Sequence, residues 1–97
     1  MDSIIELLKI ASPTIRKQFG LRTLGVFGSY ASGKNHADSD LDILYDLEDN
    51  AHLSFRDLIL LEETIERITG IKEIDLVRVP QMNPLVWLTV KDRVLYV

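Results

Sequence analysis

Two aspartates separated by a single residue, Asp40 and Asp42, are the part of this sequence best suited to chemistry. Apolar Leu41 and Ile43 alternate with them, which predicts an extended strand with both carboxylates on one face and both apolar side chains on the other. At about 4 Å and an effective dielectric of about 20, two such charges repel by about 4 kcal/mol, and a bound cation removes that repulsion. The ligands are hard oxygens and the chain has no cysteine, so Mg²⁺ or Mn²⁺ fits best. Solvated acids at a strand edge are the alternative interpretation.

A glycine and a serine, Gly28 and Ser29, precede these acids. The apolar residues 24–27 predict a short buried strand that ends at Gly28, and residues 29–33 can then form a helical turn. A glycine that leaves a strand lets backbone N–H groups approach a ligand closely, and a helix N-terminus favours an anion. The pattern therefore predicts a phosphate site to which Ser29 adds a hydroxyl. An ordinary strand-to-helix turn capped by serine is the alternative.

A third acid, Asp75, lies inside the apolar run of residues 74–79. Because its neighbours are apolar on both sides, this carboxylate must face either a site or the solvent. The combination of a glycine turn, a paired acid and a later acid favours a functional site over three unrelated surface features.

Two other motifs are excluded at positions that their chemistry requires. Residues 28–34 match the glycine and lysine spacing of a P-loop, but Asn35 stands where a P-loop needs serine or threonine to bind Mg²⁺. Residues 38–49 open like a calcium-binding loop, yet Ile43 replaces the glycine of its sharp turn and Asp49 replaces its bidentate glutamate. We therefore reject both.

Three segments together resemble the DNA polymerase β-type nucleotidyltransferases: residues 26–29, 39–42 and 73–76 match that family's pattern in order and spacing. At 97 residues the chain is similar to the minimal nucleotidyltransferase (MNT) subgroup, whose members are often paired with a HEPN-domain toxin. The resemblance covers nearly the whole chain and implies an α/β (α+β) nucleotidyltransferase fold, a small mixed β-sheet flanked by helices, in one domain spanning residues 1–97. Ser32 departs from the pattern, because many members carry an arginine before the second glycine. Lys34 is the expected replacement.

The resemblance also implies an activity and assigns roles to the site residues. It implies an antitoxin that transfers AMP from ATP to a hydroxyl, expected to be a tyrosine, of a partner HEPN toxin, with release of pyrophosphate and with Mg²⁺ or Mn²⁺ as cofactor. The assembly would then be a hetero-oligomer. The residues carried over are Asp40, Asp42 and Asp75 as catalytic metal ligands, and Gly28, Ser29 and Lys34 as phosphate-binding residues.

Two other functions stay open at this point. The chain could be a subunit of a small-molecule nucleotidyltransferase similar to the aminoglycoside-modifying enzymes, although it lacks the extra helical domain that would build an acceptor pocket. It could also be a non-catalytic antitoxin that binds its toxin and uses the acids structurally. A glycosidase acid–base pair fits poorly, because two acids on one strand have similar environments.

Composition is that of one compact domain, with 46% hydrophobic and 27% charged residues. A net charge of −4 and a pI near 5.0, with scattered basic residues, argue against direct binding of nucleic acid. No apolar run approaches the length of a membrane span, and Asp2 and Glu6 do not suit a signal peptide. We therefore expect a cytoplasmic protein without a membrane partner.

The elements that must position the site residues can be read from periodicity. An amphipathic helix is expected from residue 1, capped by Asp2 or Ser3, interrupted near Ser12 and Pro13, and ended by Gly20. A second helix is expected over residues 54–69, with a capping box of Ser54 and Asp57, an apolar face that begins at Phe55 and an end at Gly70. A strand over residues 71–79 ending at Pro80, a helix from Asn83 to about Lys91 and a last strand over residues 93–97 follow.

Three side chains outside the motif call for an interpretation. We expect His36 and His52 to be surface loop residues, because each is alone and Mg²⁺ prefers oxygen ligands. For Trp87, in the apolar helix near the end, we favour the core over a surface that contacts a partner.

Overall fold

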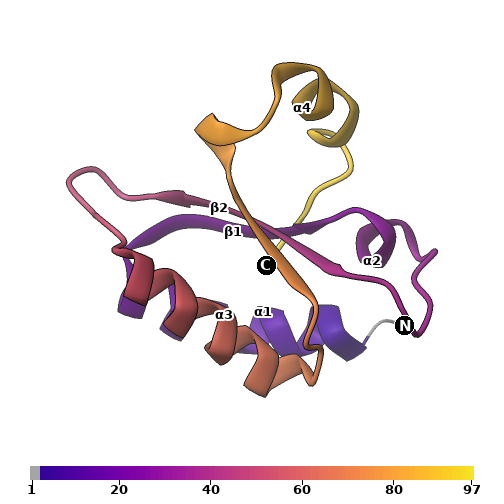
Figure 1. The fold of residues 1–97 in the computed structure, drawn as a ribbon, viewed down its shortest axis with the longest axis horizontal. Coiled ribbons are helices and arrows are strands. Elements are labelled where there is room, and N and C mark those ends of the chain that lie inside the picture. Colours follow the sequence, from indigo (N-terminus) through magenta and orange to yellow (C-terminus); the bar gives the residue numbers. More distant parts are fainter. Residues whose placement is uncertain (1–2) are drawn as a thin grey trace.

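The computed structural model describes residues 3–97, which form a four-stranded mixed sheet flanked by helices (Figure 1). This confirms the predicted fold class. The strand order is β3-β2-β1-β4, with β1 antiparallel to β2 and β4, and β2 parallel to β3. The elements are α1 (Ser3–Phe19), β1 (Leu21–Phe27), α2 (Ser29–Ser32), β2 (Leu41–Leu47), α3 (Phe55–Thr69), β3 (Ile74–Arg78), the 3-10 helix η1 (Val79–Gln81), α4 (Pro84–Val90) and β4 (Leu95–Tyr96).

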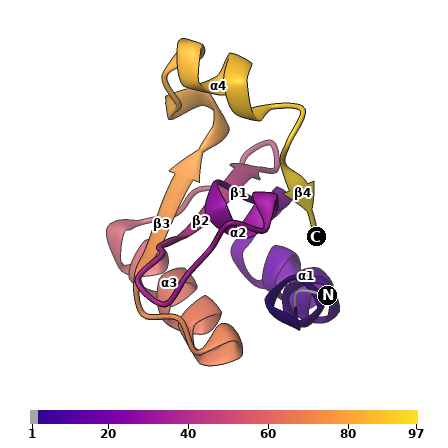
Figure 2. The same ribbon diagram turned by 90° about the vertical axis from the view of Figure 1, so that its right-hand side faces the viewer.

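The two faces of the sheet have different neighbours. Helices α1 and α3 lie against one face, and α4 stands over the other face in both views (Figures 1 and 2). Side chains alternate along β2, so that Leu41, Ile43 and Tyr45 enter the core beside α1 and α3. The intervening residues, including Asp42, point to the face over which α4 stands. Burial of the first face anchors the sheet and leaves the second face available for a site.

Helix α1 is continuous from Ser3 to Phe19, so the predicted interruption at Ser12 and Pro13 is wrong. The buried positions run without a break on both sides of Pro13, which is itself exposed: they are Ile5, Leu8, Ser12, Ile15 and Phe19. Proline costs a helix one internal hydrogen bond, and here the packing of a continuous apolar stripe outweighs that loss. The predicted cap at Asp2 lies outside the described residues.

Helix α3 begins and ends as the sequence predicts. Ser54 and Asp57 form the capping box, and Gly70 ends the helix with φ of 77°. Phe55, expected on the packing face, is instead 80% exposed, because the buried stripe begins one turn later, at Leu58. Strand β3 is shorter than predicted, since residues 71–73 form a connection rather than part of the strand, and Pro80 sits inside η1.

The C-terminal segment differs most from expectation in its packing. Asn83 caps α4 as predicted, with its side chain accepting a hydrogen bond from the Leu85 N–H at 2.8 Å. No residue of α4 is buried, Trp87 is only half-buried, and Leu85 is 74% exposed. The core assignment favoured for Trp87 is therefore wrong. A helix of two turns that stands over the sheet buries no stripe of its own.

Both histidines are exposed and lie in loops, as predicted, and the His36 Nδ1 atom accepts a hydrogen bond from the Asp38 N–H at 3.2 Å. No helix within residues 3–97 has the length and apolar character needed to cross a membrane.

The α3 cap gives a direct test of the fold. We expect Ser54→Ala to lower the free energy of unfolding by about 1 kcal/mol, because it leaves a backbone N–H of the first turn without its acceptor. Urea unfolding followed by circular dichroism measures this. The control is Thr64→Ala in the middle of the same helix, where alanine is the better helix former and stability should not fall. Equal losses in the two variants would contradict the capping role.

Candidate active site

Asp42 and Asp75 lie side by side on neighbouring parallel strands. They are register partners between β2 and β3, so their side chains project from the same face of the sheet. They lie close enough that the charge of Asp75 helps to raise the pKa of Asp42. The structure therefore brings together two acids that are far apart in the sequence, on the face over which α4 stands.

The Asp42 carboxyl is electrostatically strained. Burial is the largest cause that raises its pKa, from 3.8 to about 6, and the negative charges of Asp75 and Asp40 raise it further. A carboxylate in this position lacks a neighbouring positive charge that would stabilise its ionised form. A cation bound beside it would supply that charge.

Asp40 does not share a strand with Asp42, so this part of the prediction is wrong. β2 begins at Leu41, whose N–H donates to the Glu73 carbonyl at 2.8 Å, and Asp40 is exposed in the connection before it. Within residues 3–97, no three acidic or histidine side chains converge closely enough to hold a metal ion. The preformed unit is the Asp42–Asp75 pair with Asp40 nearby. This donor set fits Mg²⁺, which is usually held by one or two carboxylates together with substrate phosphates.

Gly28 lies directly against Asp42. It has φ of 73°, which side chains rarely allow, and an added Cβ would collide with the Asp42 Oδ2 atom and lie 3.1 Å from its Cγ. Register explains the approach, because Phe27 is the β1 partner of Asp42. The sequence correctly predicts a position that requires glycine, and the group that approaches it in the structure is the carboxylate.

Helix α2 is a single turn that follows Gly28, as predicted. Ser29 begins it and is half-buried, and Gly33 ends it in the left-handed conformation. The N–H of Lys34 donates to the Ser29 carbonyl at 3.0 Å, which closes the turn. Gly28, Ser29 and Lys34 thus form one compact turn beside the acid pair.

A cleft of about 250 Å³ opens between this turn and the C-terminal segment. Gly28, which contacts Asp42, is part of its wall, so the cleft borders the Asp42 member of the acid pair. The lining residues are Gly28, Ala31, Ser32 and Lys34 on one side, and Thr89, Val90 and Arg93 on the other. Arg93 was not among the predicted site residues. Its position depends on the pairing of β4 with β1, which local spacing does not reveal.

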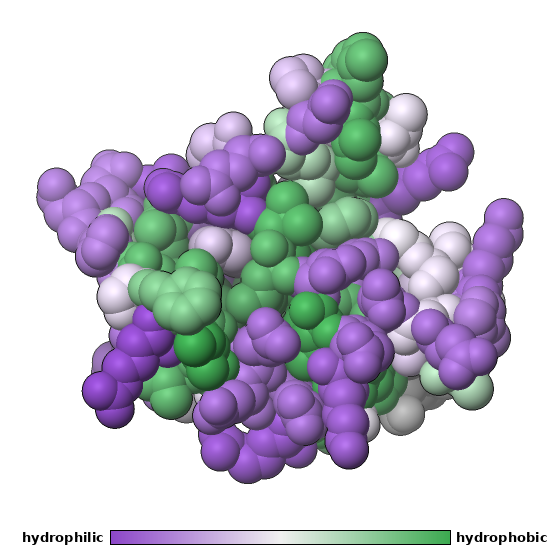
Figure 3. All heavy atoms as spheres, in the orientation of Figure 1, coloured by the Kyte–Doolittle hydropathy of each residue, from purple (hydrophilic) through white to green (hydrophobic). Residues whose placement is uncertain are grey.

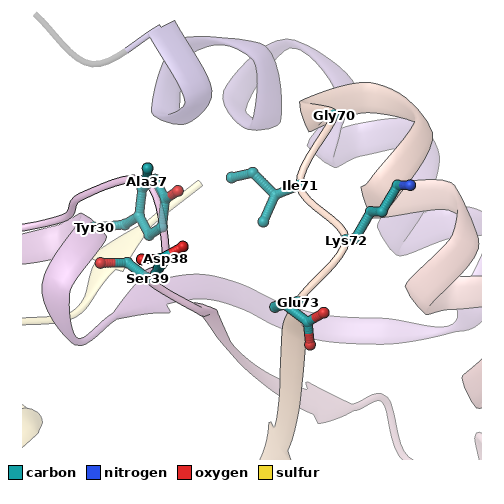
Figure 4. Close-up of a pocket in the computed structure, with 8 residues that line it drawn as sticks. All are labelled: Tyr30, Ala37, Asp38, Ser39, Gly70, Ile71, Lys72 and Glu73. Carbon is teal, nitrogen blue, oxygen red and sulfur yellow. The ribbon is translucent and has the colours of Figure 1, made fainter.

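A second cavity of about 310 Å³ lies between α2 with the following loop and the connection from α3 to β3 (Figure 4). Tyr30, Ala37, Asp38 and Ser39 form one wall, and residues 70–73 form the other. Figure 4 shows the Ile71 side chain between the two walls and the Lys72 side chain pointing away from the first wall. Neither Gly28 nor Asp42 lines this second cavity, whereas Gly28 lines the first cleft, so we place the chemistry in the first cleft.

Comparison with known proteins gives consistent results. A family model described as "Polymerase beta, Nucleotidyltransferase" matches residues 9–96. The protein adenylyltransferase MntA of Thermococcus cleftensis is 37% identical over 97 residues, which cover 100% of this chain and 95% of that protein. A solved structure described as a minimal nucleotidyltransferase superposes with a TM-score of 0.73 at 26% identity, covering 98% of this chain and 95% of the other. A toxin–antitoxin structure with AMP-PNP shares the fold, with a TM-score of 0.62 at 20% identity, covering 80% and 62% of the two chains.

The strained carboxyl predicts that Asp42→Asn stabilises the protein. The folded-state pKa of Asp42 is raised to about 6, so its contribution to stability is full below the unfolded pKa of 3.8 and is lost as the pH rises through about 6. In metal-free buffer we therefore expect Asp42→Asn to melt several degrees above the wild type at neutral and higher pH. Below about pH 4 the two proteins should melt together.

Thermal melts over a pH series measure this difference. Asp49→Asn is the matched control, because its exposed carboxylate pairs with Arg22 and its replacement should bring no such gain. A wild type that is at least as stable as Asp42→Asn at neutral pH would contradict the strain.

Proposed function

The chain belongs to the polymerase β nucleotidyltransferase family and is a nucleotidyltransferase, and on that premise we propose that it transfers AMP from ATP to a hydroxyl of a partner HEPN toxin and so acts as an antitoxin. The observation that carries the proposal is the Asp42–Asp75 pair beside the Gly28 cleft. Two further findings support it: the relative MntA is a protein adenylyltransferase, and the toxin–antitoxin structure contains AMP-PNP, an analogue of ATP.

Each part of the site has a proposed role. The turn of Gly28, Ser29 and Lys34 holds the triphosphate in the cleft. Asp42 and Asp75, with Asp40 beside them, hold divalent metal, and Mg²⁺ or Mn²⁺ fits these oxygen ligands. When bound, the metal neutralises charge on the phosphates and on the attacking and leaving oxygens.

The reaction is an in-line displacement at the α-phosphorus. The acceptor oxygen forms a bond to this phosphorus, the bond to the bridging oxygen of the β-phosphate breaks, and pyrophosphate leaves. Asp75 lies on an edge strand of the sheet and is exposed, so an incoming hydroxyl can reach it. Its carboxylate accepts the proton that the hydroxyl loses. The product is an acceptor that carries AMP.

A protein acceptor is favoured by the surface next to the cleft. Leu85, Val86 and Leu88 of α4 are 74%, 45% and 61% exposed, and they form an apolar protrusion at the top of the molecule (Figure 3). Thr89 and Val90 of the same helix line the cleft. A protein docked on α4 would therefore bring its side chains to the site. Contiguous exposed apolar side chains are a known mark of protein interaction sites.

Transfer of label from α-labelled ATP tests the activity. With Mg²⁺ present, we expect label on a partner protein that co-purifies from native lysate, and mass spectrometry should locate it on a hydroxyl side chain, expected to be a tyrosine. Asp42→Asn should reduce transfer by about a hundredfold or more, because it removes a carboxylate ligand of the divalent metal that neutralises the phosphates. Asp49→Asn, far from the cleft, should retain transfer. A stable partner that remains unlabelled would favour a non-catalytic antitoxin, and label on a small molecule would favour the small-molecule enzyme.

The docking role of α4 makes a separate prediction. We expect Leu85→Glu to weaken the complex with the labelled partner by at least about tenfold, because it buries a charge in an apolar interface. Binding of ATP should be unchanged, since Leu85 is not part of the cleft. Phe55→Glu is the control, because Phe55 is equally exposed on the opposite side of the sheet. The measurement is the equilibrium dissociation constant of each variant for the partner. A larger loss of affinity in Phe55→Glu than in Leu85→Glu would contradict docking on α4.

A further inference from the structure

We propose that Arg93, facing Lys34 across the cleft, binds the β- and γ-phosphates of the nucleotide and holds the leaving pyrophosphate. This inference rests on the proposed function and adds a residue that the motif does not contain. Arg93 and Lys34 lie on opposite walls, and Gly28, on the Lys34 wall, contacts Asp42. A phosphate chain in the cleft would have cations on both sides and Asp42 behind the Gly28 wall.

Backbone pairing explains why Arg93 reaches this place. β4 runs antiparallel to β1, with Leu95 paired to Val26 and Tyr96 to Gly25. Two residues further along this register, Arg93 falls opposite Gly28. The Arg93 N–H donates to the Val90 carbonyl at 2.8 Å, which fixes the turn between α4 and β4. The position of Arg93 therefore follows from the sheet rather than from a flexible tail.

Charge in the cleft is not neutralised by the protein itself. Arg93 and Lys34 are both exposed, and neither is paired within residues 3–97, where the ion pairs involve Arg22 and Arg78. Ser32, on the Lys34 wall, has a hydroxyl that donates to the Ser29 carbonyl at 3.2 Å and contributes no charge. The positive charge of the cleft thus comes from Lys34 on one wall and Arg93 on the other.

The size and chemistry of the cleft favour a diphosphate group. Its volume of about 250 Å³ is below the roughly 300–1,000 Å³ of sites that enclose a whole drug-sized ligand. It therefore suits the phosphate end of a nucleotide and leaves the base outside. Arginine offers a planar pair of donors that match two phosphate oxygens, whereas lysine acts as a point charge. Negative charge grows on the leaving pyrophosphate during transfer, and a cation placed there stabilises the transition state.

Binding of three ligands to the purified protein tests the inference. With Mg²⁺ present, calorimetric titration measures the affinities of ATP, inorganic pyrophosphate and AMP. We expect Arg93→Ala to lower the affinity for ATP and for pyrophosphate by about tenfold or more. The affinity for AMP should change by less than about twofold, because AMP lacks the groups that Arg93 contacts. Arg93→Lys should give intermediate affinities, since it keeps the charge and loses the paired donors.

Arg67→Ala is the matched control. Arg67 is an exposed arginine on α3, on the opposite face of the sheet, and its removal changes net charge equally. Its affinities should equal those of the wild type. Circular dichroism and thermal melts should show all variants folded, because the Arg93 side chain is exposed and its backbone hydrogen bond remains.

Two results would overturn the inference: unchanged ATP and pyrophosphate affinity in Arg93→Ala, or an equal loss for AMP. A wild type that binds none of the three ligands would overturn it as well. The titrations need no acceptor, so a protein that binds ATP through Arg93 yet transfers no label would contradict the proposed function alone. If AMP transfer occurs but Arg93→Ala binds ATP as tightly as the wild type does, this inference alone would be contradicted.

Discussion

The parallel register of β2 and β3 places the half-buried carboxylate of Asp42 beside the exposed carboxylate of Asp75, and the rest of the structure must hold them there. Left free, Asp42 and Asp75 would separate and hydrate. Burial of Leu41 and Ile43 on the opposite face of the same strand prevents this, because any slip of the strand would expose these side chains to water. The hydrophobic layer beneath the sheet thus maintains the unfavourable charge arrangement above it.

The two faces of the sheet have different roles: one forms the core, and the other stays open for the site. Helices α1 and α3 complete the core on one side, whereas among residues 3–97 the other side has α4, η1 and the turn around Gly28. The open side can therefore admit a substrate without disturbing the core. Gly28 lies where the open face meets the cleft, and its missing side chain leaves room for Asp42 there.

Much of this architecture could be predicted from local patterns. The strand ending at Gly28, the cap at Ser54 and the site acids on strands or beside them all depend on residues close in sequence. Three features could not be predicted in this way. Pro13 is tolerated because the buried stripe of α1 continues past it, and α4 lacks buried residues because of where it sits. Arg93 reaches the cleft because β4 adds to the free edge of β1. All three features depend on which elements pack against each other in the fold. The spacing of residues along one segment does not reveal that.

The order of the site residues along the chain has a consequence for synthesis. Gly28 and Asp42 come early, Asp75 follows the α3 crossover, and Arg93 comes after α4. Ribosomes deliver the chain from its N-terminus, and a parallel strand pair with a helical crossover forms only when its distant partner has emerged. The buried cluster beside α1 and α3 ends with Ile74 in β3, and the later chain adds to the core the buried Met82 and the partly buried Leu76 and Val97. A nascent chain can therefore bury most of its hydrophobic core before it gains the cleft, which makes the proposed nucleotide binding one of the last properties to appear during translation.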